Sequence, residues 1–468
     1  LEEYYVNDEH IQEALTAAYD PLHWPDWGLG QYNALNIDAE IMGDLFWVGG
    51  SNYADMQNWH LLSDFVGDQN NTLSSLWTVD YSGIKRCNDV IKYADWADKA
   101  GNISAANKKS YTDQALVLRA YYYNMLWHYF GNVPFYIDDL QEPYTAPQLS
   151  ADEIYEKVME DLEKTLKECS LPMRWDASNS GRVSKAMAYM LYAEMVMYQN
   201  DKDRYGKAYE YMTKIIESPK YDLNPDYANL WEESGEWCME SIWEINFTSV
   251  GATRSWSNML SSGGHVYGTL IGINGAKKDW YSGWGFGPVA VSAWNMFDEG
   301  DTRRDASILD WRNESDSYSP RWQDTGLFQR KYIGRKDGTA GALGDSDVNQ
   351  NSNFRIYRYA ETLLNAAELS LALGKDGSQY LKQVQERAKV KVTDCNLDTI
   401  LDERHKEFVS EGKRYWDLVR TGKAAEVLKA NNHEYRQYDW TPDLKYWPIQ
   451  ISERDKDNAI VQNPYPVR

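Results

Sequence analysis

Hydrophobic residues recur with helical spacing through much of the first half and the last quarter of the chain. Residues 150–168 show this best, because an aliphatic residue falls on the same helix face at every fourth position: Ile154, Val158, Leu162 and Leu166. Ser150 and Glu153 have the spacing of a capping box at the start of this segment. The pattern therefore predicts an amphipathic helix with a defined first residue.

Similar patterns predict the other helices. They cover residues 8–20, 73–98, 107–130, 184–199, 205–217, 354–373, 378–391, 397–411, 412–420 and 423–430. Pairs of antiparallel helices with roughly 34 residues per unit are typical of tetratricopeptide-like repeats. We therefore expect a mostly α fold built from such helix pairs.

Two long stretches lack helical periodicity. Residues 21–76 form an aromatic, turn-rich loop, and residues 220–350 are rich in Gly, Trp, Ser and Asp, with strand-like pieces such as SIWEINF. Irregular segments of this length are usually functional. We expect a single domain over residues 1–468. Residues 1–219 form N-terminal repeats that include the aromatic loop, and residues 220–353 form a variable ligand-binding insertion. Residues 354–468 form C-terminal repeats with an extended tail.

The composition narrows the range of ligands. The chain has 35 Tyr and 20 Trp but 10 Phe. Tyr and Trp combine a flat apolar face with a polar edge, which matches the C–H faces and hydroxyl edges of sugars. The net charge of −23 and the lack of a basic stripe argue against nucleic acid. Neutral or cationic ligands remain open.

The densest charge lies in residues 403–423. Glu403, Glu407 and Glu411 follow one another at four-residue intervals, which places them on one face of a predicted helix. They could form a catalytic carboxylate pair or a partly buried ion-pair network. We favour the network, because glycosidase carboxylates come from separate elements across an open cleft. The available cationic partners are Arg358, Arg387, Arg404, Arg414 and Arg420.

The sequence contains no complete motif for binding a metal or a cofactor. Asp345, Asp347, Asn349 and Asn351 alternate like the first half of a calcium loop, but the turn glycine and the final glutamate of that loop are missing. A solvated loop is favoured over a calcium site. The seven His residues show no metal-binding spacing, and neither a nucleophile elbow nor a phosphate loop occurs. We predict no catalytic residue, no metal and no cofactor.

Five segments in order carry a family resemblance. They are ALVLRAYYYNMLWHYFGNVPFY at 115–136, GRVSKAMAYMLYAEMVMY at 181–198, RYAETLLNAAEL at 358–369, ERHKEFVSEGKRYWDLVRTGK at 403–423, and the ending YWPIQ…VQNPY at 446–465. Together they resemble the SusD/RagB family. Gln450 replaces a common Pro, and Tyr465 follows Pro464 where Gly often intervenes.

The resemblance implies a SusD-like superhelix of four helix pairs packed against a variable region. It implies a non-catalytic lipoprotein on the extracellular face of the outer membrane, attached through an N-terminal lipid anchor that lies outside this chain. It also implies two partners, a glycan ligand and a TonB-dependent SusC-like transporter that receives the glycan. A peptide-binding SusD-like protein is the alternative. A glycoside hydrolase on a helical scaffold and an intracellular peptide-binding scaffold rank lower.

In such a fold, the loop after the first helix and the central insertion meet at the ligand site. We therefore predict six stacking residues: Trp47, Tyr53, Trp59, Tyr267, Trp280 and Trp284. Polar contacts are expected from Asp44, Asn52 and Arg254. Other aromatic residues of the same two segments are Trp24, Trp27, Trp256, Tyr281 and Trp294. Four more tryptophans are expected to be structural: Trp77, Trp127, Trp416 and Trp447.

Overall fold

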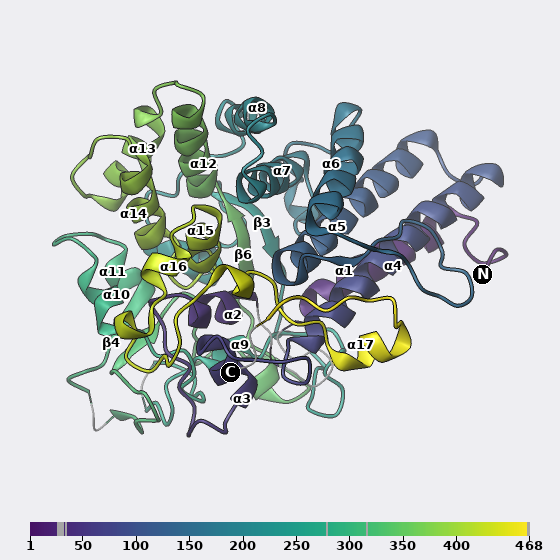
Figure 1. Cartoon of the computed structure of the whole chain (residues 1–468). Helices are drawn as coiled ribbons and strands as arrows, with labels where there is room; N and C mark the ends of the chain where they lie inside the picture. Colours follow the sequence, from purple (N-terminus) through teal and green to yellow (C-terminus); the bar gives the residue numbers. More distant parts are fainter. Residues whose placement is uncertain (26–31, 33–34, 278, 315–316, 466–468) are drawn as a thin grey trace.

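A computed structural model describes residues 1–25, 32, 35–277, 279–314 and 317–465. Its long helices pack on their neighbours in a continuous array (Figure 1). The array runs through α1 (Asp8–Tyr19), α4 (Ser74–Lys99), α5 (Ala105–Phe130), α6 (Ala151–Lys167), α7 (Lys185–Gln199), α8 (Tyr205–Ile216), α12 (Tyr359–Ala372), α13 (Ser378–Ala388), α14 (Leu397–Glu407), α15 (Arg414–Arg420) and α16 (Ala424–Val427).

Helix α12 packs directly on α8, although the whole insertion separates them in sequence. The helical array therefore continues across the insertion, much of which lies below the array (Figure 1). The predicted α fold of tetratricopeptide-like helix pairs is confirmed.

Helix α6 begins where the sequence predicts. The backbone N–H of Ser150 donates to Glu153 Oε2 at 2.9 Å, and the N–H of Glu153 donates to Ser150 Oγ at 3.3 Å. This reciprocal capping box satisfies two amide groups that the first helical turn leaves unpaired. The aliphatic residues at every fourth position are buried in the core, as predicted.

Two helix predictions are wrong at their ends. Phe354–Arg358 forms the strand β6, which pairs antiparallel with β3 (Ser241–Ile245), and the helix starts only at Tyr359. Helix α14 ends at Glu407, and Ser410 and Gly412 then adopt positive φ angles of 67° and 72°. Glu411 therefore lies in a turn and does not share the helix of Glu403 and Glu407.

The two irregular stretches contain short elements. The first includes α2 (Leu35–Met42) and α3 (Gln57–Ser63), and the second includes α9 (Tyr267–Leu270), α10 (Val291–Asn295), α11 (Arg304–Ser307) and the hairpin of β4 (Ile308–Asp310) with β5 (Leu327–Gln329). The small pair β1 (Val133–Pro134) and β2 (Gln148–Leu149) follows α5, and the tail contains α17 (Ile451–Lys456). The sequence predicts an extended tail, but α17 shows that part of the tail is helical.

The aromatic loop and the insertion meet, as expected from the family resemblance. Bridges pair Phe46 with Val289 and Gly49 with Phe286. Their meeting places α2 and α3 beside the loops around α9, below the helical array (Figure 1). Among the described helices, none is long and apolar enough to span a membrane.

Candidate functional site

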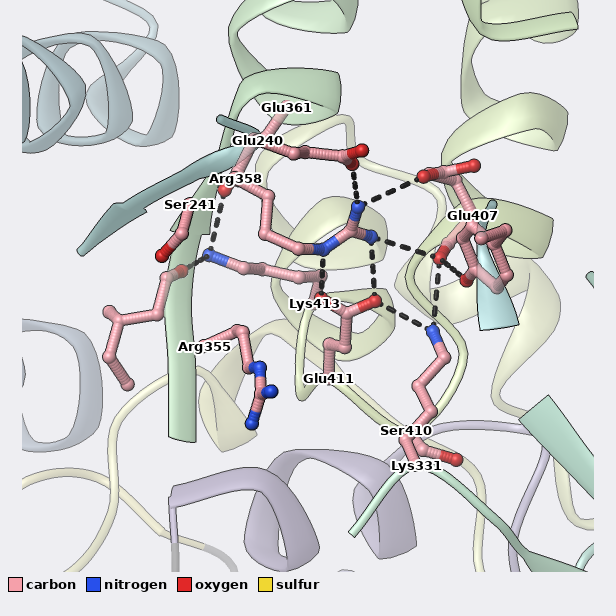
Figure 2. A network of polar contacts seen from close by, with 12 residues as sticks. Glu240, Ser241, Lys331, Arg355, Arg358, Glu361, Glu407, Ser410, Glu411 and Lys413 are labelled. Carbon is pink, nitrogen blue, oxygen red and sulfur yellow. Dashed lines mark hydrogen bonds and ion pairs between the residues drawn. The ribbon is translucent and has the colours of Figure 1, made fainter. Parts of the chain in front are cut away.

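Glu407 and Glu411 of the 403–423 segment lie in a buried network of ion pairs (Figure 2). Arg358 is at its centre: Nε and Nη2 both bind the carboxylate of Glu411 at 2.8 Å, and Nη1 binds Glu407 at 3.1 Å. The same Nη1 donates at 2.5 Å to Glu240, the residue that precedes β3. Bidentate pairing of this kind ties the turn after α14 to the β3–β6 pair.

Two cations from the insertion complete the network. Arg303 binds Glu403 and Glu407, and Lys331 donates to Glu411 at 2.7 Å. Burial favours the neutral acid, but the charges of Arg387, Arg358 and Arg303 outweigh it and hold the pKa of Glu407 well below its usual range. Every carboxylate in the network thus has a cationic partner, which confirms the structural interpretation of this charge cluster.

The partners differ in part from those expected. Arg358 and Arg387 belong to the network, as predicted. Three other predicted partners bind elsewhere: Arg404 pairs with Asp417 and Glu361, Arg414 with Asp44, and Arg420 with Glu368 and Asp417. Arg303 and Lys331 were missed, because they come from a segment far away in the sequence.

Three of the predicted ligand-binding residues are enclosed by the protein, and a fourth, which is partly exposed, is paired with an arginine. The rings of Trp59 and Tyr267 have no exposed surface. Arg254 is 2% exposed and donates to the carbonyls of Met259 and Gly264. Both carboxylate oxygens of Asp44 accept from Arg414 at 2.9 Å. A sugar needs an accessible ring face or hydrogen-bonding edge, so these four are not part of the site proposed below.

The structure does bring an exposed tryptophan and a half-buried one together. The rings of Trp256 and Trp284 are nearly parallel, at 18°, with centroids 5.7 Å apart, and Trp256 is 40% exposed. Tyr32 packs its edge against Trp284, with centroids 5.9 Å apart. We call the Trp256–Trp284 pair the tryptophan platform.

Hydrogen-bonding groups flank the tryptophan platform. The backbone N–H of Trp256 donates to Asp345 Oδ2 at 2.9 Å, and the hydroxyl of Tyr281 donates to Asp347 Oδ1 at 2.7 Å. The N–H of Trp284 and the carbonyl of Asp347 both bond to Thr269. The segment that resembled half a calcium loop therefore lies beside the platform and supplies two carboxylates there.

A second group of aromatic rings lies near Gly50, whose carbonyl accepts from the N–H of Trp322 at 3.0 Å. Tyr53 stacks on His60 at 5.0 Å, Trp322 lies 5.0 Å from His60, and Tyr435 lies 6.4 Å from Trp322. We call Tyr53, Trp322 and Tyr435 the second aromatic cluster. Burial lowers the pKa of His60 to about 4, so the imidazole beneath these rings is neutral at pH 7.

Trp47 lies behind the second cluster, 6% exposed, with its ring against His433 and Tyr435. Trp280 is half-buried, and the guanidinium of Arg335 lies 4.8 Å from its ring centroid. Among the described residues, no ring contact joins Trp280 to either aromatic group. Asn52 is exposed, and its side chain accepts from the N–H of Ala54. Trp27 lies outside the described residues.

Three residues of these clusters escaped the sequence analysis. Trp256 was noted among the aromatic residues but not selected, and Trp322 and Tyr435 were not noted. Trp322 lies two residues after Pro320 in an irregular stretch, and Tyr435 lies in a polar stretch before the tail. A search for aromatic residues in polar, turn-rich surroundings would have found both.

Comparisons with known proteins agree with this architecture. A family model described as the SusD family matches residues 309–465, and one described as "Starch-binding associating with outer membrane" matches residues 10–197. Surface glycan-binding protein A from Bacteroides thetaiotaomicron, solved in complex with laminarihexaose, is 45% identical, with a TM-score of 0.93 over 98% of this chain and 100% of that chain.

Two further solved structures are similar along nearly their whole length. Surface glycan-binding protein A from Bacteroides uniformis is 49% identical, with a TM-score of 0.91 over 98% of this chain and 100% of that one. A laminarin-binding SusD-like protein is 27% identical, with a TM-score of 0.87 over 98% of this chain and 99% of that one.

Proposed function

Because the chain belongs to the SusD/RagB family, we propose that it is a non-catalytic protein that binds a laminarin-type β-1,3-glucan on the tryptophan platform. The observation that carries this proposal is the exposed ring of Trp256, stacked on the half-buried ring of Trp284. It occurs in a chain 45% identical to a protein solved with laminarihexaose.

The chemistry of the platform suits a neutral sugar. An exposed tryptophan face gains apolar contact with the C–H face of a sugar ring. The carboxylates of Asp345 and Asp347 accept hydrogen bonds from hydroxyl groups around the ring edge. Glucans carry no charge, so the net charge of −23 does not oppose their approach.

Hydrolysis of the glycan has no comparable support. A glycosidase needs two carboxyl groups about 5–10 Å apart on either side of an open cleft. Glu407 and Glu411 are instead buried and paired with cations. The surface glycan-binding and laminarin-binding relatives are also named for binding.

Family membership also supports a location and a second partner. We place the protein at the outer membrane, on its extracellular face, and we assign to it the transfer of bound glycan to a TonB-dependent SusC-like transporter. The family model that matches residues 10–197 describes association with the outer membrane. Co-purification of such a transporter with the tagged protein supports this assignment, and recovery of the protein without one contradicts it.

Calorimetry with a glycan panel tests the binding proposal. We expect laminarihexaose to bind, and Trp256→Ala to weaken binding about fivefold or more, since one aromatic contact contributes about 1 kcal/mol. Trp294→Ala is the matched control, because that ring packs under Arg304 and Arg312 and is not part of the platform. Binding of a peptide in place of every glycan, or release of reducing sugar, contradicts the proposal.

A further inference from the structure

An exposed carboxylate is held beside the first ring of the tryptophan platform. Asp345 Oδ2 accepts the backbone N–H of Trp256 at 2.9 Å, and the side chain of Asp345 is exposed. The two chain segments are also joined through their backbones. The N–H of Asp345 donates to the carbonyl of Arg254 at 3.1 Å, and the N–H of Gly344 donates to the carbonyl of Ala252 at 3.0 Å. One pair of adjoining loops therefore presents both the aromatic ring and the negative charge.

Close packing fixes the loop that carries this carboxylate. A Cβ atom on Gly344 would lie 2.0 Å from the carbonyl oxygen of Arg254, so the two loops are in direct backbone contact. The side chain of Asn349 is buried, and its Nδ2 donates to the carbonyls of Arg254 at 2.8 Å and Asp345 at 2.7 Å. The backbone at Asp345 is thus held by its neighbours, which keeps the charge beside the platform when a ligand approaches.

A second carboxylate is linked to the other ring of the platform. Asp347 is half-buried, and its Oδ1 accepts the hydroxyl of Tyr281 at 2.7 Å. Its carbonyl accepts Thr269 Oγ1 at 2.8 Å, and the carbonyl of Thr269 accepts the N–H of Trp284 at 2.8 Å. One residue therefore connects Asp347 with Trp284.

The two carboxylates have no ion-pair partner in the described part of the chain. Neither Asp345 nor Asp347 pairs there with a lysine, arginine or histidine. Arg254 is 2% exposed, and its side chain donates to two backbone carbonyls. Arg335, which follows the segment bonded to Tyr281, binds Glu232 at 3.1 Å. Aspartate is ionised at neutral pH, so a ligand on the platform meets two negative charges.

We propose that Asp345 and Asp347 make the tryptophan platform selective for uncharged sugars, so that it rejects glycans that carry carboxylate or sulfate groups. This inference rests on the proposed function. A sugar hydroxyl donates a hydrogen bond to an aspartate, whereas an ionised carboxylate or sulfate group has no proton to donate. Such a group also meets like charge at short range. Repulsion between two unit charges about 4 Å apart lowers affinity roughly fivefold even in a water-like environment.

A matched pair of ligands tests this inference by calorimetry. The neutral ligand is laminarihexaose, and the charged ligand is the same β-1,3-linked hexasaccharide with its C6 hydroxymethyl groups oxidised to carboxylates. The measured quantity is the ratio of the two dissociation constants. We expect the native protein to prefer laminarihexaose at least about fivefold in about 0.05 M salt, and less in about 0.5 M salt, because salt screens the repulsion.

Two variants assign the preference to these residues. The double substitution Asp345→Asn with Asp347→Asn removes both charges and keeps side-chain oxygens that accept hydrogen bonds, so the ratio should fall several-fold. Glu386→Gln is the control for net charge, since Glu386 is exposed on α13 and pairs with Lys382 there, and it should leave the ratio at the native value. The exposed position of Asp345 makes the single substitution Asp345→Asn a second variant that preserves the fold.

The outcomes separate this inference from the proposed function. If the native protein does not bind laminarihexaose, the proposed function fails. If it binds both ligands equally, or if the double variant keeps the native ratio, the charge selectivity is refuted while the tryptophan platform stands. A preference that is undiminished in high salt, or that falls equally in Glu386→Gln, also refutes it. Thermal unfolding of each variant at the native midpoint verifies that the fold is intact.

Discussion

Substitution of Glu407 by glutamine removes one negative charge from the buried ion-pair network and preserves the size of the side chain. The carboxylate of Glu407 accepts from Arg303, Arg358 and Arg387, and its side chain is fully buried. With a neutral amide in place of the carboxylate, less negative charge balances the positive charges of these neighbouring guanidinium groups. Its NH2 group also points a donor at donors.

The magnitude follows from burial and from the partners that remain. Removal of one member of a buried ion pair costs about 3–5 kcal/mol, because the partner charge stays buried. Here Glu240, Glu403 and Glu411 still bind the three arginines. We therefore expect a loss at the lower end, about 3 kcal/mol. Glu386→Gln is the control, since Glu386 is exposed and 3.6 Å from Lys382, and it should cost less than about 1 kcal/mol.

The loss should depend on pH. Arginine charges hold the pKa of Glu407 in the folded protein below its unfolded value of about 4.3. The stabilisation is therefore complete above pH about 4.3 and is lost as the pH falls toward the lower folded pKa. The difference between the native protein and Glu407→Gln should be largest near neutral pH and shrink in acid.

Urea unfolding followed by tryptophan fluorescence measures this effect. Glu407→Gln should unfold at a clearly lower urea concentration than Glu386→Gln at pH 7. Laminarihexaose affinity should be unchanged below the transition, because the network is not part of the proposed site. Equal midpoints for the two variants, or an unfolding difference that does not vary with pH, would refute the reasoning.

Four further substitutions test the packing, the helix cap and a buried acid. Gly83→Ala would put a Cβ atom 2.3 Å from the ring of Tyr122 where α4 packs on α5, and should cost about 1–3 kcal/mol. A Cβ atom at Gly206 in α8 would meet nothing within 4 Å, so Gly206→Ala should stabilise the protein by up to about 1 kcal/mol. Equal effects of the two glycine substitutions on the free energy of unfolding would contradict the packing argument. Ser150→Ala should cost about 1 kcal/mol by removing the cap of α6, and an unchanged unfolding midpoint would show that the cap contributes nothing. Burial raises the pKa of Glu40 to about 8, so the native protein loses stability as the pH rises from about 4.3 to 8. Glu40→Gln should abolish that loss, so its free energy of unfolding relative to that of the native protein should rise by about 1.4 kcal/mol per pH unit in this window. Parallel pH profiles of the two proteins would contradict this prediction.

Local signals explain why the helical part was predictable. The capping box and the aliphatic spacing of α6 depend on residues within one or two turns of each other. The same holds for most long helices, so the α fold and the order of its elements follow from the sequence. The family motifs lie in these same segments, which is why the resemblance and the helical pattern agree.

Non-local contacts explain the errors. Phe354–Arg358 continues a helical pattern into α12, but pairing with β3, more than a hundred residues earlier, makes it a strand. Glu411 has the spacing of a helical face, but the turn at Ser410 and Gly412 removes it from α14. In the first case a tertiary contact outweighs the local pattern, and in the second a turn interrupts it.

The ligand site was the hardest part to predict. Residue type identifies Trp and Tyr as stacking residues but does not say which ring is buried. Trp59 and Trp256 both lie in irregular stretches, yet Trp59 has no exposed surface and Trp256 is 40% exposed. Trp322 and Tyr435 join Tyr53 only because segments far apart in sequence meet at Gly50 and around Trp47.

A crystal structure of the protein with laminarihexaose tests the central claim most directly. The account predicts sugar rings stacked on Trp256 and Trp284, with hydroxyl groups bonded to Asp345 or Asp347. Laminarihexaose bound elsewhere, for example in the groove between α4 and α17 that Tyr81, Tyr136 and Tyr144 line, with the tryptophan platform empty, would contradict it.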